Sequence, residues 1–193
     1  LREAGRAAAL GAHPNVARVY RAPERDGVRF LVTQHVDGSS LARVLRLAPR
    51  LPYGVACHVL AQTARALAHA HAHGLAHGDV HATNVLLDRT GAVVVTDFAV
   101  AAIAVPNDAP SPADDQRALG ALAYEMLAGV SPWPLGAADG GAPPTPLGAL
   151  RHDCPAALER LVHGMLAPSP ADRWADLAAV CAMLAEVEPE IAR

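Results

Sequence analysis

The chain contains no lysine, because all 16 of its basic residues are arginine. A site in which a lysine ammonium group holds nucleotide phosphates is therefore excluded within these 193 residues. Cysteine is also scarce: Cys57, Cys154 and Cys181 lie far apart and form no CxxC pair. This spacing indicates neither a disulfide framework nor a zinc site, and a reducing, cytoplasmic setting is expected.

Long apolar runs are absent as well. No uninterrupted run approaches the ~20 residues of a membrane-spanning helix, and no signal-peptide pattern opens the chain. We expect no membrane span in this segment, which leaves room for it to be the cytoplasmic part of a larger membrane protein. The net charge of −3 gives no case for nucleic acid as the main partner.

The first 36 residues predict only short elements, a helix and two strands. A helix is predicted over 1–12, ending before Pro14, because the residue that precedes a proline is disfavoured in helical conformation. Two β-rich runs follow at 16–20 and 28–36, with the polar sequence PERDG between them as a turn. The chain begins at Leu1 with no turn or strand signal, so we expect further sequence before it.

The remainder is mainly helical. A long Ala-rich helix is predicted over 52–73, with Gly74 as its C-terminal cap. A hairpin of 85–87 and 92–96 would bring Asn84 and Asp97 close together. Helical spacing of apolar residues then recurs at 119–127, 158–166 and 177–184, whereas 106–112 and 131–148 are irregular. An α+β chain with a helical bundle in its second half is expected.

Two motifs carry the chemistry: HGDVHATN at 77–84 and TDFA at 96–99. Phosphoryl transfer requires a positioned hydroxyl group, divalent cations on the phosphates and neutralised charge. Asp79 would orient or deprotonate the accepting hydroxyl group. Asn84 and Asp97 would supply the amide and carboxylate oxygens that Mg²⁺ prefers.

These motifs resemble those of the eukaryotic-like protein kinases, particularly the bacterial serine/threonine kinases, over nearly the whole chain. HGDVHATN stands for the family's HRDxKxxN, and DFA stands for its DFG. Residues 1–10 resemble the end of the family's C helix, with Glu3 at the place of its glutamate. HPNVARVY resembles the entry to the fourth strand, and FLVTQHVDGSSL resembles the fifth strand and the hinge.

The resemblance implies a protein-kinase-like α+β fold with a mainly helical C-lobe and a truncated N-lobe. Residues 1–36 would form the partial N-lobe and hinge, and 37–193 the C-lobe. The resemblance implies that Asp79 and His81 are catalytic residues. It implies that ATP is bound by Thr33 (the gatekeeper), Gln34, Val36 and Asn84. Mg²⁺ would be bound by Asn84 and Asp97. Asp115 would cap the family's F helix and brace the HGD backbone, and Arg173 matches a late C-lobe arginine.

The departures from the family pattern are also specific. The chain lacks the glycine-rich phosphate loop and the lysine of the third strand. His81 replaces the catalytic-loop lysine, and a histidine is mostly neutral near pH 7. Ala99 replaces the last glycine of DFG. The run from Asp97 to Asp115 has about half the family's usual length and contains no APE motif, so Arg173 has lost its glutamate partner.

Three functions remain open at this point. The first is a catalytically impaired kinase domain that acts as a regulatory or docking module, whose protein partner could depend on phosphorylation. In style it is similar to the pseudokinase domain fused to the actinobacterial lipid II flippase. The second is part of an active kinase whose glycine loop and lysine lie upstream. The third is a small-molecule phosphotransferase, because HGDxHxxN also occurs in aminoglycoside- and choline-kinase-like enzymes.

Each candidate residue also has a structural interpretation. Asn84 and Asp97 could satisfy backbone groups in turns. We expect His77 to be a buried, hydrogen-bonded histidine that packs against Phe98. His69, His71 and His73 alternate along one helix, so only the first and the third share a face, and they are expected to be surface or core residues and not metal ligands.

Overall fold

The computed structural model describes residues 10, 13–21, 23–26, 28–98, 110–133 and 143–191. Its strands are β1 (Val19–Arg21), β2 (Glu24–Arg25), β3 (Val28–Arg29), β4 (Val32–Thr33), β5 (Gly38–Ser40), β6 (Val85–Asp88) and β7 (Val93–Val95). Its helices are α2 (Leu41–Leu47), α3 (Tyr53–Ala72), α5 (Pro112–Ala128), α6 (Leu147–Leu150), α7 (Ala156–Met165) and α8 (Leu177–Ile191), with a 3-10 turn, η1 (Pro170–Asp172). The helix predicted over 1–12, including Glu3, lies outside the described residues except for Leu10, and so does Ala99.

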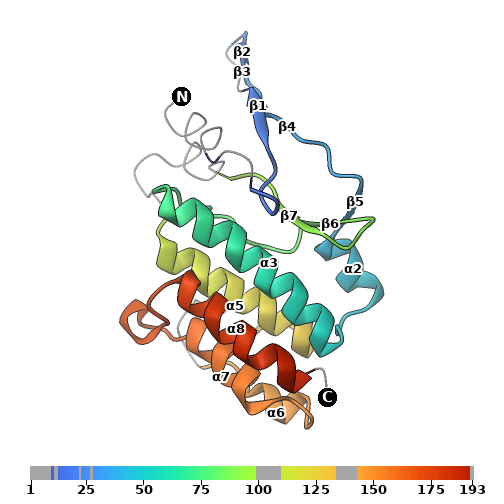
Figure 1. The fold of residues 1–193 in the computed structure, drawn as a ribbon, viewed down its shortest axis with the longest axis vertical. Helices are drawn as coiled ribbons and strands as arrows, with labels where there is room; N and C mark the ends of the chain where they lie inside the picture. The colour runs from blue at the N-terminus through green and yellow to red at the C-terminus, as the bar shows by residue number, and fades with distance from the viewer. Residues whose placement is uncertain are drawn as a thin grey trace.

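Helix α3 confirms the long helix predicted over 52–73. Pro52 precedes its first turn, and Gly74 follows it with φ 69°, a left-handed conformation that suits glycine. Alanines allow close packing along its length, and Leu60 and Leu67 are fully buried where α3 lies against α5 and α8. Figure 1 shows these three helices running side by side through the lower part of the molecule.

Helix α5 confirms the apolar stripe predicted over 119–127. Ser111 caps its N-terminus by accepting a hydrogen bond from the backbone N–H of Asp114, whose side chain accepts one from the backbone N–H of Ser111 in return. Gly129 ends the helix with φ 76°. Leu119 and Met126 are completely buried between α3 and α7, so α5 lies at the centre of the bundle.

The C-terminal helices complete the predicted bundle. The apolar residues predicted on one face of α7 are buried, and so are those of α8 except Cys181, which is half-buried. Gly120 lets α5 approach α7 closely, because a Cβ at this glycine would lie 2.8 Å from the Cβ of Met165. Half of the irregular run 131–148 lies outside the described residues, and its last two residues open α6.

A three-stranded antiparallel sheet, ordered β5-β6-β7, joins the bundle to the upper part of the molecule. The predicted hairpin is confirmed: Val85 pairs with Val95, and the turn after Asp88 passes through Gly91 with φ 85°. No local sequence pattern predicts β5 as a partner of β6, or the helix α2, which Ser40 caps. Short strands and a seven-residue helix contain too few periodic positions to be recognised.

The prediction of one strand over 28–36 is wrong. This run is divided into β3, which pairs with β2, and β4, which pairs with β1. The predicted PERDG turn itself contains β2. The reason is exposure: Tyr20, Val28 and Phe30 are 50–59% exposed, so no buried face holds the run in a single register. These strands form a narrow projection at the top of Figure 1.

Candidate active site

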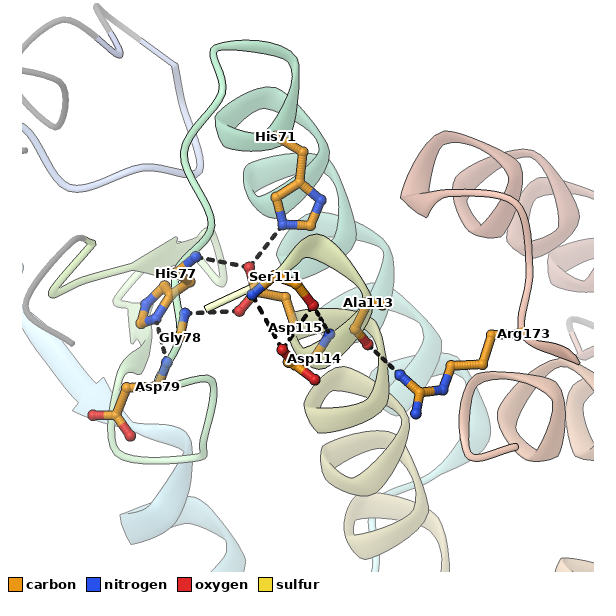
Figure 2. Close-up of polar contacts among 9 residues, drawn as sticks. All are labelled: His71, His77, Gly78, Asp79, Ser111, Ala113, Asp114, Asp115 and Arg173. Atoms are coloured by element: carbon orange, nitrogen blue, oxygen red, sulfur yellow. Dashed lines mark hydrogen bonds and ion pairs between the residues drawn. The ribbon is translucent and has the colours of Figure 1, made fainter. Parts of the chain in front are cut away.

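The loop that contains the HGD motif is held by one buried carboxylate, that of Asp115 in α5. Its Oδ2 accepts the backbone N–H of His77 at 2.7 Å, and its Oδ1 accepts the backbone N–H of Gly78 at 2.8 Å (Figure 2). Asp115 is 1% exposed. The expected brace is therefore present, whereas the expected capping role belongs to Ser111 and Asp114, since the Asp115 carboxylate is directed at the loop.

His71 is a member of this brace that the sequence analysis missed. Its Nε2 lies 2.7 Å from Asp115 Oδ2, and its side chain is 12% exposed. The imidazole comes from the last turn of α3, so α3, α5 and the loop meet at one carboxylate group (Figure 2). The alternation of His71 with His69 and His73 did not indicate this role, because the spacing along one helix does not show which side chain of a distant helix it will meet.

His77 is the buried, hydrogen-bonded histidine that the sequence predicted. Its Nε2 lies 2.8 Å from the carbonyl oxygen of Thr96, and its Nδ1 accepts the backbone N–H of Asp79 at 3.2 Å. Its ring centroid is 4.6 Å from that of Phe98. Burial lowers the pKa of His77, so the ring is neutral with its proton on Nε2, and it links the loop to the strand end that precedes Asp97.

Asp79 lies beyond this buried anchor and is half-exposed. Asn84 Nδ2 donates to the Asp79 carbonyl oxygen at 2.9 Å and approaches its carboxylate oxygen Oδ2 at 3.3 Å. His81 Nε2 is 3.3 Å from the same Oδ2. Because His81 Nδ1 accepts the backbone N–H of Thr83, Nε2 carries the proton and faces Asp79. The structure therefore brings Asp79, His81 and Asn84 together around one exposed carboxylate group.

Asp97 follows β7 in a left-handed conformation, with φ 62°. This backbone conformation costs free energy in a residue other than glycine, and such strain is often found at functional sites. The backbone of Thr96 donates to Asn84 O at 2.9 Å, which places Asp97 beside the end of the loop. With Asn84 Nδ2 occupied by Asp79, the amide oxygen of Asn84 and the carboxylate of Asp97 are a donor set that suits Mg²⁺.

The predicted hinge residues lie between the projecting strands and β5. Thr33 ends β4. The backbone N–H of Gln34 donates to Arg18 O at 2.8 Å, which ties the hinge to the segment before β1. Val36 is half-buried. The contact of these residues with a nucleotide stays a prediction.

Arg173 replaces its missing glutamate partner with backbone carbonyl groups. Its guanidinium donates to Ala167 O, Ala113 O and Pro168 O at 2.6–3.1 Å, and Ala113 belongs to the first turn of α5 (Figure 2). Desolvation lowers its pKa. The arginine thus still joins the loop before η1 to the N-terminus of α5.

The described residues contain neither a multi-residue metal site of histidine, cysteine and acidic side chains nor a membrane-spanning helix. No group of three or more His, Cys, Asp or Glu side chains there is arranged to hold a metal ion, so the alternating histidines of α3 form no such site. His69 and His73 do share a face, with ring centroids 4.4 Å apart. Among the same residues, no helix has the length and apolarity needed to cross a membrane.

The comparisons with known proteins agree with this geometry. The protein kinase domain family matches residues 1–113. Serine/threonine-protein kinase PknA of Mycobacterium tuberculosis is 33% identical over 210 aligned residues, covering 90% of this chain and 47% of PknA. Serine/threonine-protein kinase PrkC of Bacillus subtilis is 34% identical over 100 residues, covering 52% of this chain and 15% of PrkC.

A eukaryotic relative is also similar. The cAMP-dependent protein kinase type 3 of Saccharomyces cerevisiae is 27% identical over 139 residues, 63% of this chain and 35% of the yeast protein. The chain thus spans less than half the length of each of these three curated relatives. The family match covers more than half of the chain, and the HGD loop, its Asp115 brace and the strand end before Asp97 have the expected arrangement. The chain therefore belongs to the protein kinase family, with bacterial serine/threonine kinases among its relatives.

Proposed function

We propose that this chain is the lower lobe and hinge of a serine/threonine kinase-type domain that binds Mg-ATP, transfers phosphate poorly and serves as a regulatory or docking module. The observation that carries the proposal is the pairing of Asp79 with His81. The loop that aligns a hydroxyl group is assembled, but the residue beside its carboxylate group is an imidazole, and the sequence has no lysine to hold the phosphates.

The residues of the loop and the hinge would orient the acceptor hydroxyl group, hold Mg²⁺ and contact the adenine ring. Asp79 is exposed and held through its backbone, so it can accept a hydrogen bond from a serine or threonine hydroxyl group and orient that group. Asn84 and Asp97 would hold Mg²⁺, which neutralises phosphate charge when bound. The backbone of Gln34 and Val36 would contact the adenine ring, with Thr33 behind it.

We expect catalysis to be impaired because the site lacks a permanent positive charge beside Asp79. A lysine beside Asp79 would present a permanent positive charge to the transferred phosphoryl group, whereas the imidazole of His81 is a weaker and conditional neutraliser. The side chain of His81 is 46% exposed, so solvent also screens its interaction with a phosphoryl group. Transfer should therefore be slow even where nucleotide and metal ion bind.

A docking role is supported by the surface next to the loop. A cavity of about 350 Å³ opens there, and its wall includes His81, Leu122 and Trp133. The run from Asp97 to Asp115 is too short for the usual platform that holds a protein substrate. A partner protein seated on this face, with its affinity set by phosphorylation, is the regulatory mode that we propose, in keeping with a cytoplasmic part of a larger membrane protein.

A transfer assay on the full-length protein tests the impairment. We expect labelled γ-phosphate to reach a general serine/threonine acceptor such as myelin basic protein slowly, with no more than a few-fold loss in the Asp79→Asn variant. Rapid transphosphorylation that Asp79→Asn abolishes would defeat the proposal.

The second candidate is an active kinase with its phosphate loop and lysine upstream of Leu1. The contact of Asn84 with both the carbonyl and the carboxylate of Asp79 favours it, because this geometry is the one that catalysis would need. The same assay separates the two candidates, since the active kinase is the one that shows rapid, Asp79-dependent transfer.

A further inference from the structure

Three histidine rings stack in a row where the segment before β1 meets the end of α3. His13 belongs to that segment, His69 lies in the last turn of α3, and His73 caps the helix. The rings of His13 and His69 are stacked with centroids 4.6 Å apart, and the centroids of His69 and His73 are 4.4 Å apart. We call these three rings the histidine stack. None of them belongs to the candidate active site.

Each ring of the histidine stack makes a hydrogen bond that suits a neutral imidazole. His13 Nδ1 accepts the backbone N–H of Asn15 at 3.2 Å. His69 Nε2 donates to the carbonyl oxygen of Leu10 at 2.7 Å, and His73 Nδ1 donates to that of His69 at 2.8 Å. A carbonyl oxygen only accepts, so these contacts fix which nitrogen of His69 and of His73 carries the proton. All the hydrogen bonds of the stack are therefore made with the three rings neutral.

The histidine stack lies at the junction between the projecting strands and the packed bundle. Beside it, Asn15 donates from Nδ2 to Gln62 Oε1 of α3 and to Val93 O of β7, both at 2.8 Å. The backbone N–H of Ala17 donates to Val95 O at 2.9 Å. In Figure 1 the chain rises from this junction into β1. Contacts at the junction therefore decide how firmly the projection is held on α3.

The described side chains that face the histidine stack include cations, but none forms an ion pair with it. They are Arg65 of α3, and Arg18, Tyr20 and Gln34 on the side of the strands. From α8, Cys181 lies close to Arg65 and Asp176, and His58 of α3 contacts Gln62. The histidines that do contact a carboxylate among the described residues are His71 and His81. A positive charge on the stack would therefore lack a carboxylate partner there.

Protonation acts against this arrangement. A proton on His13 Nδ1 would turn the acceptor of the Asn15 N–H into a second donor, so this contact would be lost. Burial, the charge of His69 and the charge of Arg65 all lower the pKa of His13. The closed junction thus binds fewer protons than an open one. Its stabilisation is complete above the usual histidine value of 6.5 and is lost as the pH falls below that value.

We propose that His13, His69 and His73 form a pH-sensitive switch between the segment before β1 and α3. Neutral rings keep the junction closed. Protonation in mildly acidic solution opens it and frees the projecting strands from the bundle. The switch is a property of the fold and operates with or without a bound nucleotide, so it goes beyond the proposed function and does not depend on it.

Amide hydrogen exchange of the full-length protein tests the switch. The reporters are the N–H groups of Ala17 and Val95, which form hydrogen bonds across the junction, and the reference is buried Ala123 in α5. Protection factors remove the intrinsic pH dependence of exchange. Relative to Ala123, we expect the protection of both reporters to fall about fivefold between pH 7.5 and pH 5.5. An equal fall at all three amides would mean that the whole chain responds, and it would overturn the switch.

A matched pair of variants locates the response. His13→Phe keeps a ring on His69 and removes the titrating group, whereas His152→Phe makes the same change at an exposed histidine between α6 and α7. We expect the relative fall in protection to shrink to about twofold or less in His13→Phe and to stay at about fivefold in His152→Phe. The same fall in both variants would assign the response to another histidine, such as His58, and would overturn the role of the stack.

An NMR titration of the His13 ring measures the coupling within the stack directly. In His69→Gln, the side-chain amide can still donate to Leu10 O, but the neighbouring charge is gone. We expect the pKa of His13 to rise in this variant, because the charge of His69 is one cause of its low value, and to stay below 6.5 because burial remains. An unchanged pKa of His13 would show that the rings titrate independently and would contradict the switch.

Discussion

His81 contacts the carboxylate of Asp79 from a position where the relatives' motif has lysine. The imidazole Nε2 lies 3.3 Å from Asp79 Oδ2, and the backbone N–H of Thr83 fixes the ring by donating to Nδ1. The geometry of the loop is thus maintained without the permanent charge. We therefore expect the replacement of lysine by His81 to lower the rate of phosphate transfer and to leave the fold of the loop unchanged.

The variant His81→Lys should transfer phosphate faster than the native protein. A permanent charge next to the transferred group should raise the rate about tenfold, equivalent to about 1.4 kcal/mol of transition-state stabilisation. The rate of γ-phosphate transfer by full-length protein measures the effect. His152→Lys, at an exposed histidine between α6 and α7, is the matched control with the same charge change. Equal rates in the two variants would contradict the role given to His81.

The stability of the chain should also depend on pH through His77. Burial lowers its pKa below the usual histidine value of 6.5, so the folded state binds fewer protons than the unfolded state around and below pH 6.5. Stability therefore rises with pH in this window and is lost as the pH falls, by up to about 1.4 kcal/mol per pH unit for one group. Burial also lowers the pKa of His13 and His163, and both act in the same direction.

Urea unfolding at pH 5 to 8 checks this dependence. In His77→Phe, which keeps a ring against Phe98, the free energy of unfolding should rise less steeply with pH than in the native protein. A slope of the opposite sign, with stability increasing as the pH falls, would refute the assignment of a neutral buried imidazole.

Asp115 is the residue on which the elements converge. Its carboxylate accepts from two loop N–H groups and contacts His71, so Asp115→Asn replaces one acceptor with a donor among groups that all donate. We expect a loss of about 2–3 kcal/mol in the free energy of unfolding, together with faster amide exchange at Gly78. Asp114→Asn, at the exposed capping position, should cost less than about 1 kcal/mol and leave that exchange unchanged.

The long helices were predictable, and the reason is visible in their residues. Leu119 to Leu127 and Leu158 to Leu166 repeat with helical spacing because one face of each helix is buried, and Gly74 marks the end of α3. Short elements carry no such repeat. Strand β5 and the break between β3 and β4 depend on pairing with distant residues, which a local pattern does not contain.

The packing between α5 and α7 provides a test at the scale of elements. Ala at position 120 would meet the Cβ of Met165 and the side chain of Leu166 at 2.8–3.2 Å, so Gly120→Ala should destabilise the chain by about 1–3 kcal/mol. Gly54→Ala, in the first turn of α3, meets nothing within 4 Å and should instead stabilise by about 0.5 kcal/mol. Chemical unfolding measures the free energy of unfolding of both variants. Equal changes in that free energy would mean that the close approach of α5 and α7 is not essential.

For the candidate site, the sequence proposed candidate residues but did not indicate all the contacts that hold them. Asp79, Asn84 and Asp97 were identified from their spacing, and the packing of His77 on Phe98 followed from the family resemblance. The contact of His71 with Asp115 and the carbonyl partners of Arg173 could not be predicted, because both depend on the positions of helices far apart in sequence.

At the scale of the whole molecule, the described residues divide into a firmly packed bundle and a thin projection. The core lies almost entirely among the helices and the β5-β6-β7 sheet, whereas β1 to β4 expose large apolar side chains. Two-stranded ribbons are marginally stable alone, so the nucleotide contacts of the hinge should depend on what packs against them. The proposed Mg²⁺ ligands, Asn84 and Asp97, flank β6 and β7 in the packed part and do not share this dependence.

The most direct test of the account is a thermal-shift titration of the full-length protein with ATP, with and without Mg²⁺, alongside the variant Asp97→Asn. Ligand that binds the folded form must stabilise it, by about 2.7 kcal/mol at a concentration 100 times the Kd. The account predicts a rise in Tm of about 5 °C or more that requires Mg²⁺ and is lost in Asp97→Asn. No shift at saturating ATP, or a shift that is independent of both Mg²⁺ and Asp97, would contradict it.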